Sequence, residues 1–102
     1  DSPIAPDPFQ VFCEAMVSRW PTGVNIGCNR LSGGVLQAGM ISTTDRWMVE
    51  TDGKTFRIGR AGGMPTGRSW GEGTDLDAAM NAWAEKDPSP AVMAITRASL
   101  GR

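Results

Sequence analysis

Few residues of this chain could do acid–base chemistry, because histidine and tyrosine are absent. Histidine is the usual general base near neutral pH, so triads that depend on it are excluded within these 102 residues. Asp75 and Asp77 are two acids at a predicted helix start, but residues two apart on a helix do not face each other. We therefore expect these acids to cap and stabilise the helix, and the sequence predicts that the protein is not an enzyme.

Cys13 and Cys28 are the only two cysteines. Their spacing is far from the Cys-x-x-Cys pattern of thiol oxidoreductases, and no second pair is present to complete a zinc site. Two interpretations remain open: a structural disulfide in an oxidising compartment, or two buried thiols in a reducing one. A bridge would close a loop of about 15 residues and would stabilise the fold by roughly 3 kcal/mol in the chain-entropy model.

Two ligand motifs are incomplete. The segment Gly53–Thr55 ends like a phosphate-binding P-loop, but Met48 stands where the motif requires its upstream glycine. Asp45, Glu50 and Asp52 lack the alternating acids and the terminal glutamate of an EF-hand loop. The sequence therefore predicts neither a metal site nor a cofactor.

The best candidate for a binding surface lies between Lys54 and Trp70. Four basic residues occur there with no acidic residue between them: Lys54, Arg57, Arg60 and Arg68. Arginine can hold a phosphate or a carboxylate with two hydrogen bonds, and Trp70 could stack on a base or enter a pocket of a partner. We select Arg57, Arg60, Arg68 and Trp70 as the partner-binding residues.

The formal net charge of −1 argues against a surface built for nucleic acid. Arginine and tryptophan are enriched among the residues that dominate protein–protein binding. The favoured function is a non-enzymatic binding or inhibitory module that engages a protein partner through a glycine-rich loop, with a nucleic-acid or phosphate-ligand binder as the alternative. A third interpretation gives the loop no function and packs its tryptophan on the core.

Length and composition indicate one domain, because 102 residues with 40% hydrophobic side chains suit a single core. We expect residues 1–7 to form an extended lead-in and residues 8–102 a soluble α+β domain with no membrane insertion. The chain begins at Asp1 without methionine, so we expect that a signal peptide, a tag or a longer polypeptide preceded it. The compartment stays undetermined, with an exported or periplasmic location slightly favoured over the cytoplasm.

Asp7 and Pro8 predict the start of a first helix, as N-cap and first helical residue. Spacings of three, four and seven define the face that should enter the core: Phe9, Phe12, Cys13, Met16, Val17 and Trp20. Strands are predicted over 24–28 and 35–42, and Gly39 within the second suggests a bulge or a close backbone approach.

A hairpin is predicted over 46–60, because Asp52-Gly53 readily supplies the positive φ angles of a two-residue type I′ turn. This register pairs Thr51 with Lys54, Val49 with Phe56 and Trp47 with Ile58. The glycine content of 61–73 indicates a long loop.

Caps at Asp75 and Ser89 predict two further helices, the second closing at Gly101. Tryptophans and methionines at apolar positions of the predicted elements should fill the core rather than a cofactor pocket: Met16, Trp20, Trp47, Met80 and Trp83. The sequence thus predicts an α+β two-layer sandwich with an N-terminal helix, a three- to four-stranded antiparallel meander and two short C-terminal helices on one sheet face.

Overall fold

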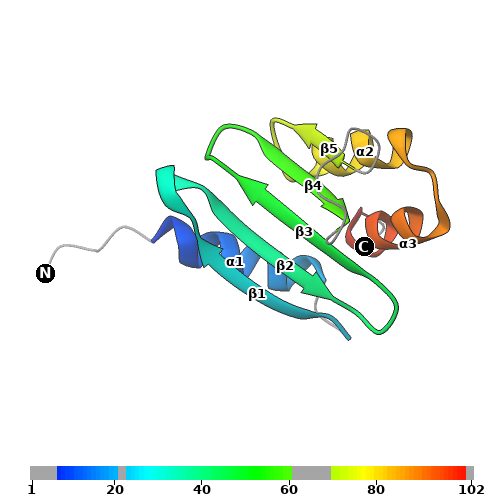
Figure 1. Cartoon of the computed structure of the whole chain (residues 1–102), viewed down its shortest axis with the longest axis horizontal. Coiled ribbons are helices and arrows are strands. Elements are labelled where there is room, and N and C mark those ends of the chain that lie inside the picture. Colours follow the sequence, from blue (N-terminus) through cyan, green and yellow to red (C-terminus); the bar gives the residue numbers. More distant parts are fainter. Residues whose placement is uncertain (1–6, 21–22, 61–69, 101–102) are drawn as a thin grey trace, which may run out of the picture.

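The computed structural model describes residues 7–20, 23–60 and 70–100. Its elements run in the order α1 (Pro8–Arg19), β1 (Asn25–Arg30), the 3₁₀ turn η1 (Ser32–Gly34), β2 (Leu36–Ile41), β3 (Arg46–Thr51), β4 (Phe56–Arg60), β5 (Trp70–Gly73), α2 (Leu76–Lys86) and α3 (Pro90–Leu100) (Figure 1). Within the described ranges the strands form one antiparallel sheet of five, in the order β1-β2-β3-β4-β5. The predicted α+β class is confirmed, with five strands in place of three or four.

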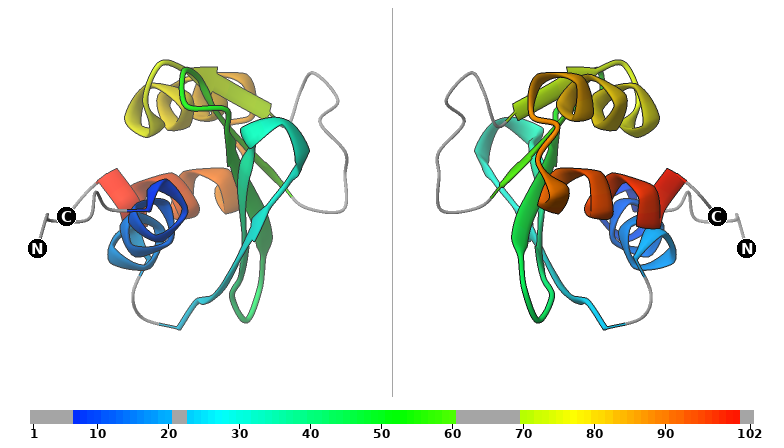
Figure 2. Two further views of the ribbon diagram at one scale, coloured as in Figure 1. Left: turned by 90° about the vertical axis from the view of Figure 1, so that its left-hand side faces the viewer. Right: turned by 90° about the vertical axis from the view of Figure 1, so that its right-hand side faces the viewer.

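The three helices of the described ranges cover one face of the sheet (Figure 2). α1 packs over β1 and β2, α2 packs over β4 and β5, and α3 packs on α2. Side chains alternate between the faces of a strand, so every second residue enters the layer between sheet and helices. That layer holds one cluster of buried side chains: Phe12, Met16, Trp20, Ala38, Met40, Trp47, Val49, Ile58, Leu76, Ala79, Met80, Trp83, Val92 and Ile95. The predicted core positions of the tryptophans and methionines are confirmed.

The three helix starts follow the predicted caps. The carboxylate of Asp7 accepts a hydrogen bond from the Phe9 amide at 3.1 Å, and that of Asp75 accepts one from the Ala78 amide at 2.8 Å. The Ser89 hydroxyl accepts one from the Val92 amide at 3.4 Å.

No helix within the described ranges has both the length and the apolar composition needed to cross a bilayer.

On the predicted core face of α1, Phe12, Met16 and Trp20 are buried, Phe9 and Cys13 are half-buried, and Val17 is 51% exposed. It follows Cys13 by four residues and therefore lies on the same stripe of the helix. Since Cys13 faces β1, which is an edge strand, this stripe borders the rim of the sheet rather than its centre.

The register of the β3–β4 hairpin differs from the prediction by two residues. Thr51 pairs with Phe56 and Val49 pairs with Ile58, so the loop comprises the four residues 52–55. Because side chains alternate with a period of two, a shift of two leaves every side chain on its predicted face. The prediction of the faces is thus confirmed, while the predicted pairing is wrong.

The type of the hairpin turn also differs. Gly53 has a φ of 94°, but no residue other than glycine has a positive φ in the described chain, which excludes a type I′ turn at Asp52-Gly53. The Asp52 carboxylate instead accepts hydrogen bonds from the backbone amides of Thr55 at 2.9 Å and Lys54 at 2.8 Å. These hydrogen bonds lower the pKa of Asp52, because they favour its ionised form, and the one from the Thr55 amide has the largest effect.

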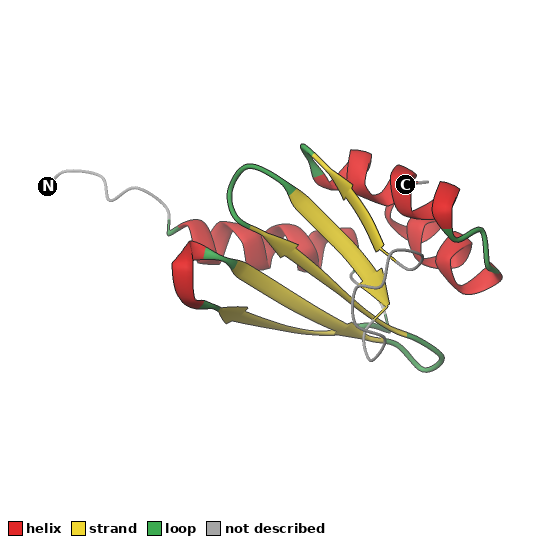
Figure 3. Ribbon diagram, turned by 45° about the horizontal axis from the view of Figure 1, so that its top comes forward, coloured by secondary structure: helices red, strands yellow, loops and turns green. Residues whose placement is uncertain are grey.

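The end of the predicted long loop is in fact β5, which pairs with β4. β5 lies beside α2 (Figure 3). Its two glycines face this helix at very short range. A Cβ on Gly71 would lie 2.5 Å from the Trp83 nitrogen, and one on Gly73 would lie 2.6 Å from the Ala78 Cβ. These glycines therefore serve the packing of strand against helix, which their composition alone did not reveal. The rest of that loop, residues 61–69, lies outside the described residues.

Gly39 causes neither of the predicted features. It pairs with Gly27 on one side and Met48 on the other in an unbroken register, so β2 has no bulge. A Cβ built on Gly39 would meet no described atom within 4 Å, which excludes a close backbone approach.

Candidate functional site

The sheet face opposite the helices brings together two of the residues predicted to bind a partner. We call this surface the open face. By alternation from the buried positions, it carries the side chains or glycines of Asn25, Gly27, Asn29, Gln37, Gly39, Ile41, Arg46, Met48, Glu50, Arg57, Gly59, Trp70 and Glu72. Arg57 lies here on β4, and Trp70 lies on β5, half-buried and opposite Gly59.

The other two predicted residues do not join them. Arg60 ends β4 opposite Trp47, at a strand position that faces the helix layer. Its guanidinium lies 3.7 Å from an Asp45 carboxylate oxygen. Arg68 lies outside the described residues. The structure therefore places Arg57 and Trp70 on one surface without Arg60.

Acidic side chains from neighbouring strands offset the charge of Arg57. Glu50 on β3 and Glu72 on β5 are its direct cross-strand neighbours. The Arg57 Nε lies 3.8 Å from Glu72 Oε2, while Glu50 Oε2 accepts a hydrogen bond from the Gln37 amide at 3.0 Å. Exposed pairs of this kind contribute little to stability, but the two glutamates around one arginine mean that this part of the open face carries no excess of positive charge.

A second row of the open face is apolar and largely without side chains. Paired positions on successive strands place Gly27, Gly39, Met48, Gly59 and Trp70 in line across the sheet. Met48 and Trp70 are half-buried, so this row offers one sulfur-containing and one aromatic side chain. Met48 is not among the binding residues selected from the sequence, although its position two residues before Glu50 on a predicted strand puts both side chains on one face.

Beside the glycines of this row lies an open hollow of about 530 Å³, which we call the glycine groove. Its open-face lining consists of Asn25, Gly27, Asn29, Gln37, Gly39, Ile41 and Arg46. The amide side chains supply both donors and acceptors, and Ile41 is 46% exposed. This combination of neutral amides, one apolar side chain and the single charged Arg46 suits a polypeptide better than a polyanion.

The remaining acids noted in the sequence have structural roles. Asp75 caps α2, while Asp77 forms an ion pair with Arg19 of α1 at 2.5 Å. Among the described residues, no three His, Cys, Asp or Glu side chains cluster as metal ligands would.

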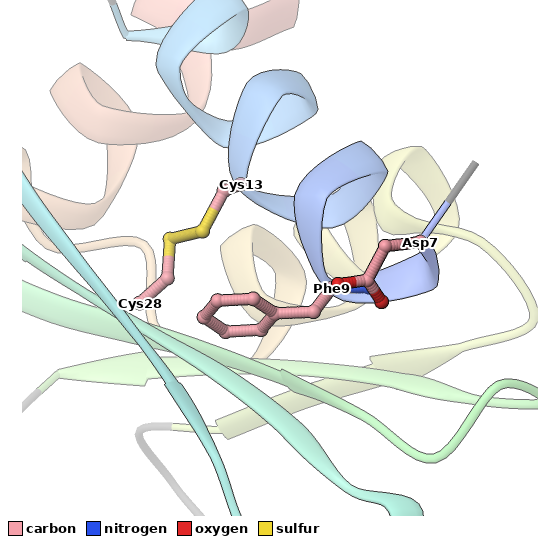
Figure 4. Close-up of a disulfide and its surroundings, with 4 residues drawn as sticks. All are labelled: Asp7, Phe9, Cys13 and Cys28. Atoms are coloured by element: carbon pink, nitrogen blue, oxygen red, sulfur yellow. A yellow bond between two sulfur atoms is a disulfide. The ribbon is translucent and has the colours of Figure 1, made fainter.

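Cys13 and Cys28 form a disulfide that links α1 to β1 (Figure 4). Their Cα atoms are 6.0 Å apart, a usual separation for a bridged pair. Beside the bridge, the Arg30 guanidinium lies 4.7 Å from the ring centre of Phe9 and pairs with the Asp7 carboxylate. Helix and strand are therefore joined covalently at the middle of α1 and by charge at its N-terminal end.

No family model matches this sequence, and no match was found among curated proteins or solved structures.

Proposed function

We propose that this protein is a non-enzymatic binding module that engages a protein partner through the open face, centred on Trp70 and Met48. The observation that carries the proposal is the half-buried Trp70 on a sheet face over which no described helix packs. Tryptophan is enriched among the residues that dominate protein interfaces, where its large surface is removed from water. Binding across this face would also allow the module to inhibit its partner by occlusion.

The charge distribution favours a protein over a nucleic acid. Arg57 is flanked by Glu50 and Glu72, and Arg60 lies beside Asp45. Binding to a phosphate backbone requires uncompensated positive charge, since the release of counterions drives it. One arginine between two glutamates instead complements a partner that presents charges of both signs.

The non-enzymatic part of the proposal rests on the sequence, which contains no histidine and no tyrosine. Inhibition by surface contact needs no proton transfer, so the side chains on the open face need only bind.

The test begins with a photo-crosslinking amino acid placed at Trp70 or, as control, at the exposed Glu85 of α2. We expect an adduct with a defined protein from position 70 only. With that protein purified, Trp70→Ala should weaken binding by about 30-fold, the effect of losing a hot-spot residue worth 2 kcal/mol. Met93→Ala, an exposed apolar truncation on α3, should leave the affinity within about twofold.

Equal affinities for the parent and a correctly folded Trp70→Ala variant would refute the proposal. The competing nucleic-acid function is tested with a single-stranded oligonucleotide at low and moderate salt. Tight binding that weakens steeply with salt would replace the protein partner by a polyanion.

A further inference from the structure

The outer edge of β1 carries backbone groups that bond to no described strand. The Leu31 amide donates to the Val35 carbonyl at 2.8 Å, which makes this pair hydrogen-bonded. Hydrogen-bonded and non-bonded pairs alternate along an antiparallel ladder, so every second residue back along β1 bonds to β2. The amide and carbonyl groups of Ile26, Cys28 and Arg30 therefore point away from β2, toward the free edge.

Among the described residues, this edge lacks most of the devices that usually prevent strands from pairing. Proteins protect edge strands with charged side chains, lysine above all, and with proline, bulges or very short strands. β1 has six residues, contains neither lysine nor proline, and pairs with β2 in an unbroken register. Its one charged residue, Arg30, stands at the last position of the strand and pairs with Asp7. Asn25, Gly27 and Asn29 are all exposed along it. As far as the described part of the chain extends, the edge is thus open to a further strand.

The edge strand is also held in place before any partner arrives. The disulfide fixes Cys28 to α1 (Figure 4). Arg30 is held by Asp7 and the ring of Phe9. A strand that is already ordered loses less conformational entropy when it pairs, so association costs less.

We propose that β1 pairs antiparallel with β1 of a second copy of this chain, about a two-fold axis through Gly27. In this register Ile26 exchanges backbone hydrogen bonds with Cys28 of the partner subunit, which uses the outward-pointing groups of both strands. Opposite residues share a face, so both open faces and both helix layers continue across the axis. Asn25 faces Asn29 of the partner subunit, where the two amides can hydrogen-bond.

Glycine at the axis favours this register. Gly27 meets its own copy in the non-hydrogen-bonded position, where Cα atoms approach to about 4.5 Å and side chains crowd most. A register centred on Cys28 would instead oppose Ile26 to Arg30 of the partner subunit, although the Arg30 side chain is committed to Asp7 within its own chain.

The position of α1 indicates why the occupant is a second copy rather than an isolated peptide. α1 lies over β1 and β2, and strands are about 4.8 Å apart, so symmetry would bring the two α1 axes to about 10 Å. This is the usual distance between packed helices. Val17, 51% exposed on the stripe that borders this rim, would be covered by the second α1, whereas a peptide strand alone would leave it in water.

The test is a charge-reversal series at Asn25 and Asn29, followed by sedimentation equilibrium. Asn25→Lys with Asn29→Lys sets like charges opposite each other twice across the axis, which should weaken dimerisation about tenfold. Asn25→Lys with Asn29→Glu sets opposite charges at the same two contacts and should restore the parent affinity. Circular dichroism checks that both variants keep the fold.

Hydrogen exchange supplies a second readout. The amides of Ile26 and Cys28 should become protected as protein concentration rises, while that of Gly27 is protected at every concentration because it bonds to β2. A parent that stays monomeric with rapidly exchanging Ile26 and Cys28 amides would overturn the proposal. Equal dimerisation affinities of the two charge variants would also overturn it. Because β1 and Trp70 lie at opposite edges of the sheet, either result leaves the proposed function standing.

Discussion

Replacing Gly71 with alanine tests how closely α2 packs on β5. The added Cβ would lie 2.5 Å from both the nitrogen and the Cβ of Trp83. Ordinary contact begins near 3.4 Å, so α2 would have to move away from the sheet by about 1 Å. The obstacle is helix backbone and the base of a buried side chain, which cannot rotate aside.

The expected cost follows from what α2 buries. Leu76, Ala79, Met80 and Trp83 all enter the core, and a gap of this size forfeits a quarter to a half of the dispersion energy at each contact. Overpacked cores lose about 1–3 kcal/mol, and a rigid obstacle places this variant near the upper value. We therefore expect the free energy of unfolding to fall by about 3 kcal/mol, roughly a hundredfold in the equilibrium constant.

Guanidinium denaturation followed by tryptophan fluorescence measures this loss, with Gly39→Ala as the matched control. Gly39 lies in the same sheet, and its new Cβ would meet no described atom within 4 Å. That variant should be unchanged, or more stable by up to about 1 kcal/mol through reduced freedom of the unfolded chain. Equal stabilities of the two variants would show that α2 does not approach β5 as described.

Two further predictions concern the disulfide and the hairpin loop. Replacing Cys13 and Cys28 with serine should lower the free energy of unfolding by about 3 kcal/mol, and a reducing agent should then destabilise the parent but not the variant; a parent insensitive to reduction would contradict this. The pKa of Asp52 is lowered in the folded state, so its ionised form stabilises the fold above the unfolded value of 3.8, and that contribution is lost as pH falls through the folded pKa. Asp52→Asn should therefore be less stable than the parent at pH 7 and converge with it in acid, whereas a pH-independent difference between them would count against the hydrogen bonds from Thr55 and Lys54.

Local sequence signals predicted the elements that depend on local contacts. Asp7, Asp75 and Ser89 cap their helices because a cap needs only the next three residues. The hairpin shows the limit of such signals. The Asp52 carboxylate accepts hydrogen bonds from the amides of Lys54 and Thr55, and these compete with the two-residue turn that Asp52-Gly53 favours in isolation.

β5 could not be predicted from local propensity, because glycine is depleted in strands. Gly71 and Gly73 are required by α2, which follows only later in the chain. A glycine within a strand can signal the close approach of another backbone, and this holds for Gly71 but not for Gly39. Gly71 lies on the sheet face that the helices cover and Gly39 lies on the open face, and neither local sequence contains that information.

The same separation between local sequence and fold changes the interpretation of the basic segment. Along the chain, Lys54 to Arg68 carries no acidic residue, which suggests a positive patch. In the sheet, Arg57 has acidic neighbours because antiparallel pairing draws Glu50 and Glu72 from the adjacent strands. The charges counted along one strand describe only part of the surface, because the neighbouring side chains come from other strands. The row beside Trp70, in which Arg57 stands between two glutamates, is therefore the stronger argument for a protein partner, since it follows from the register rather than from composition.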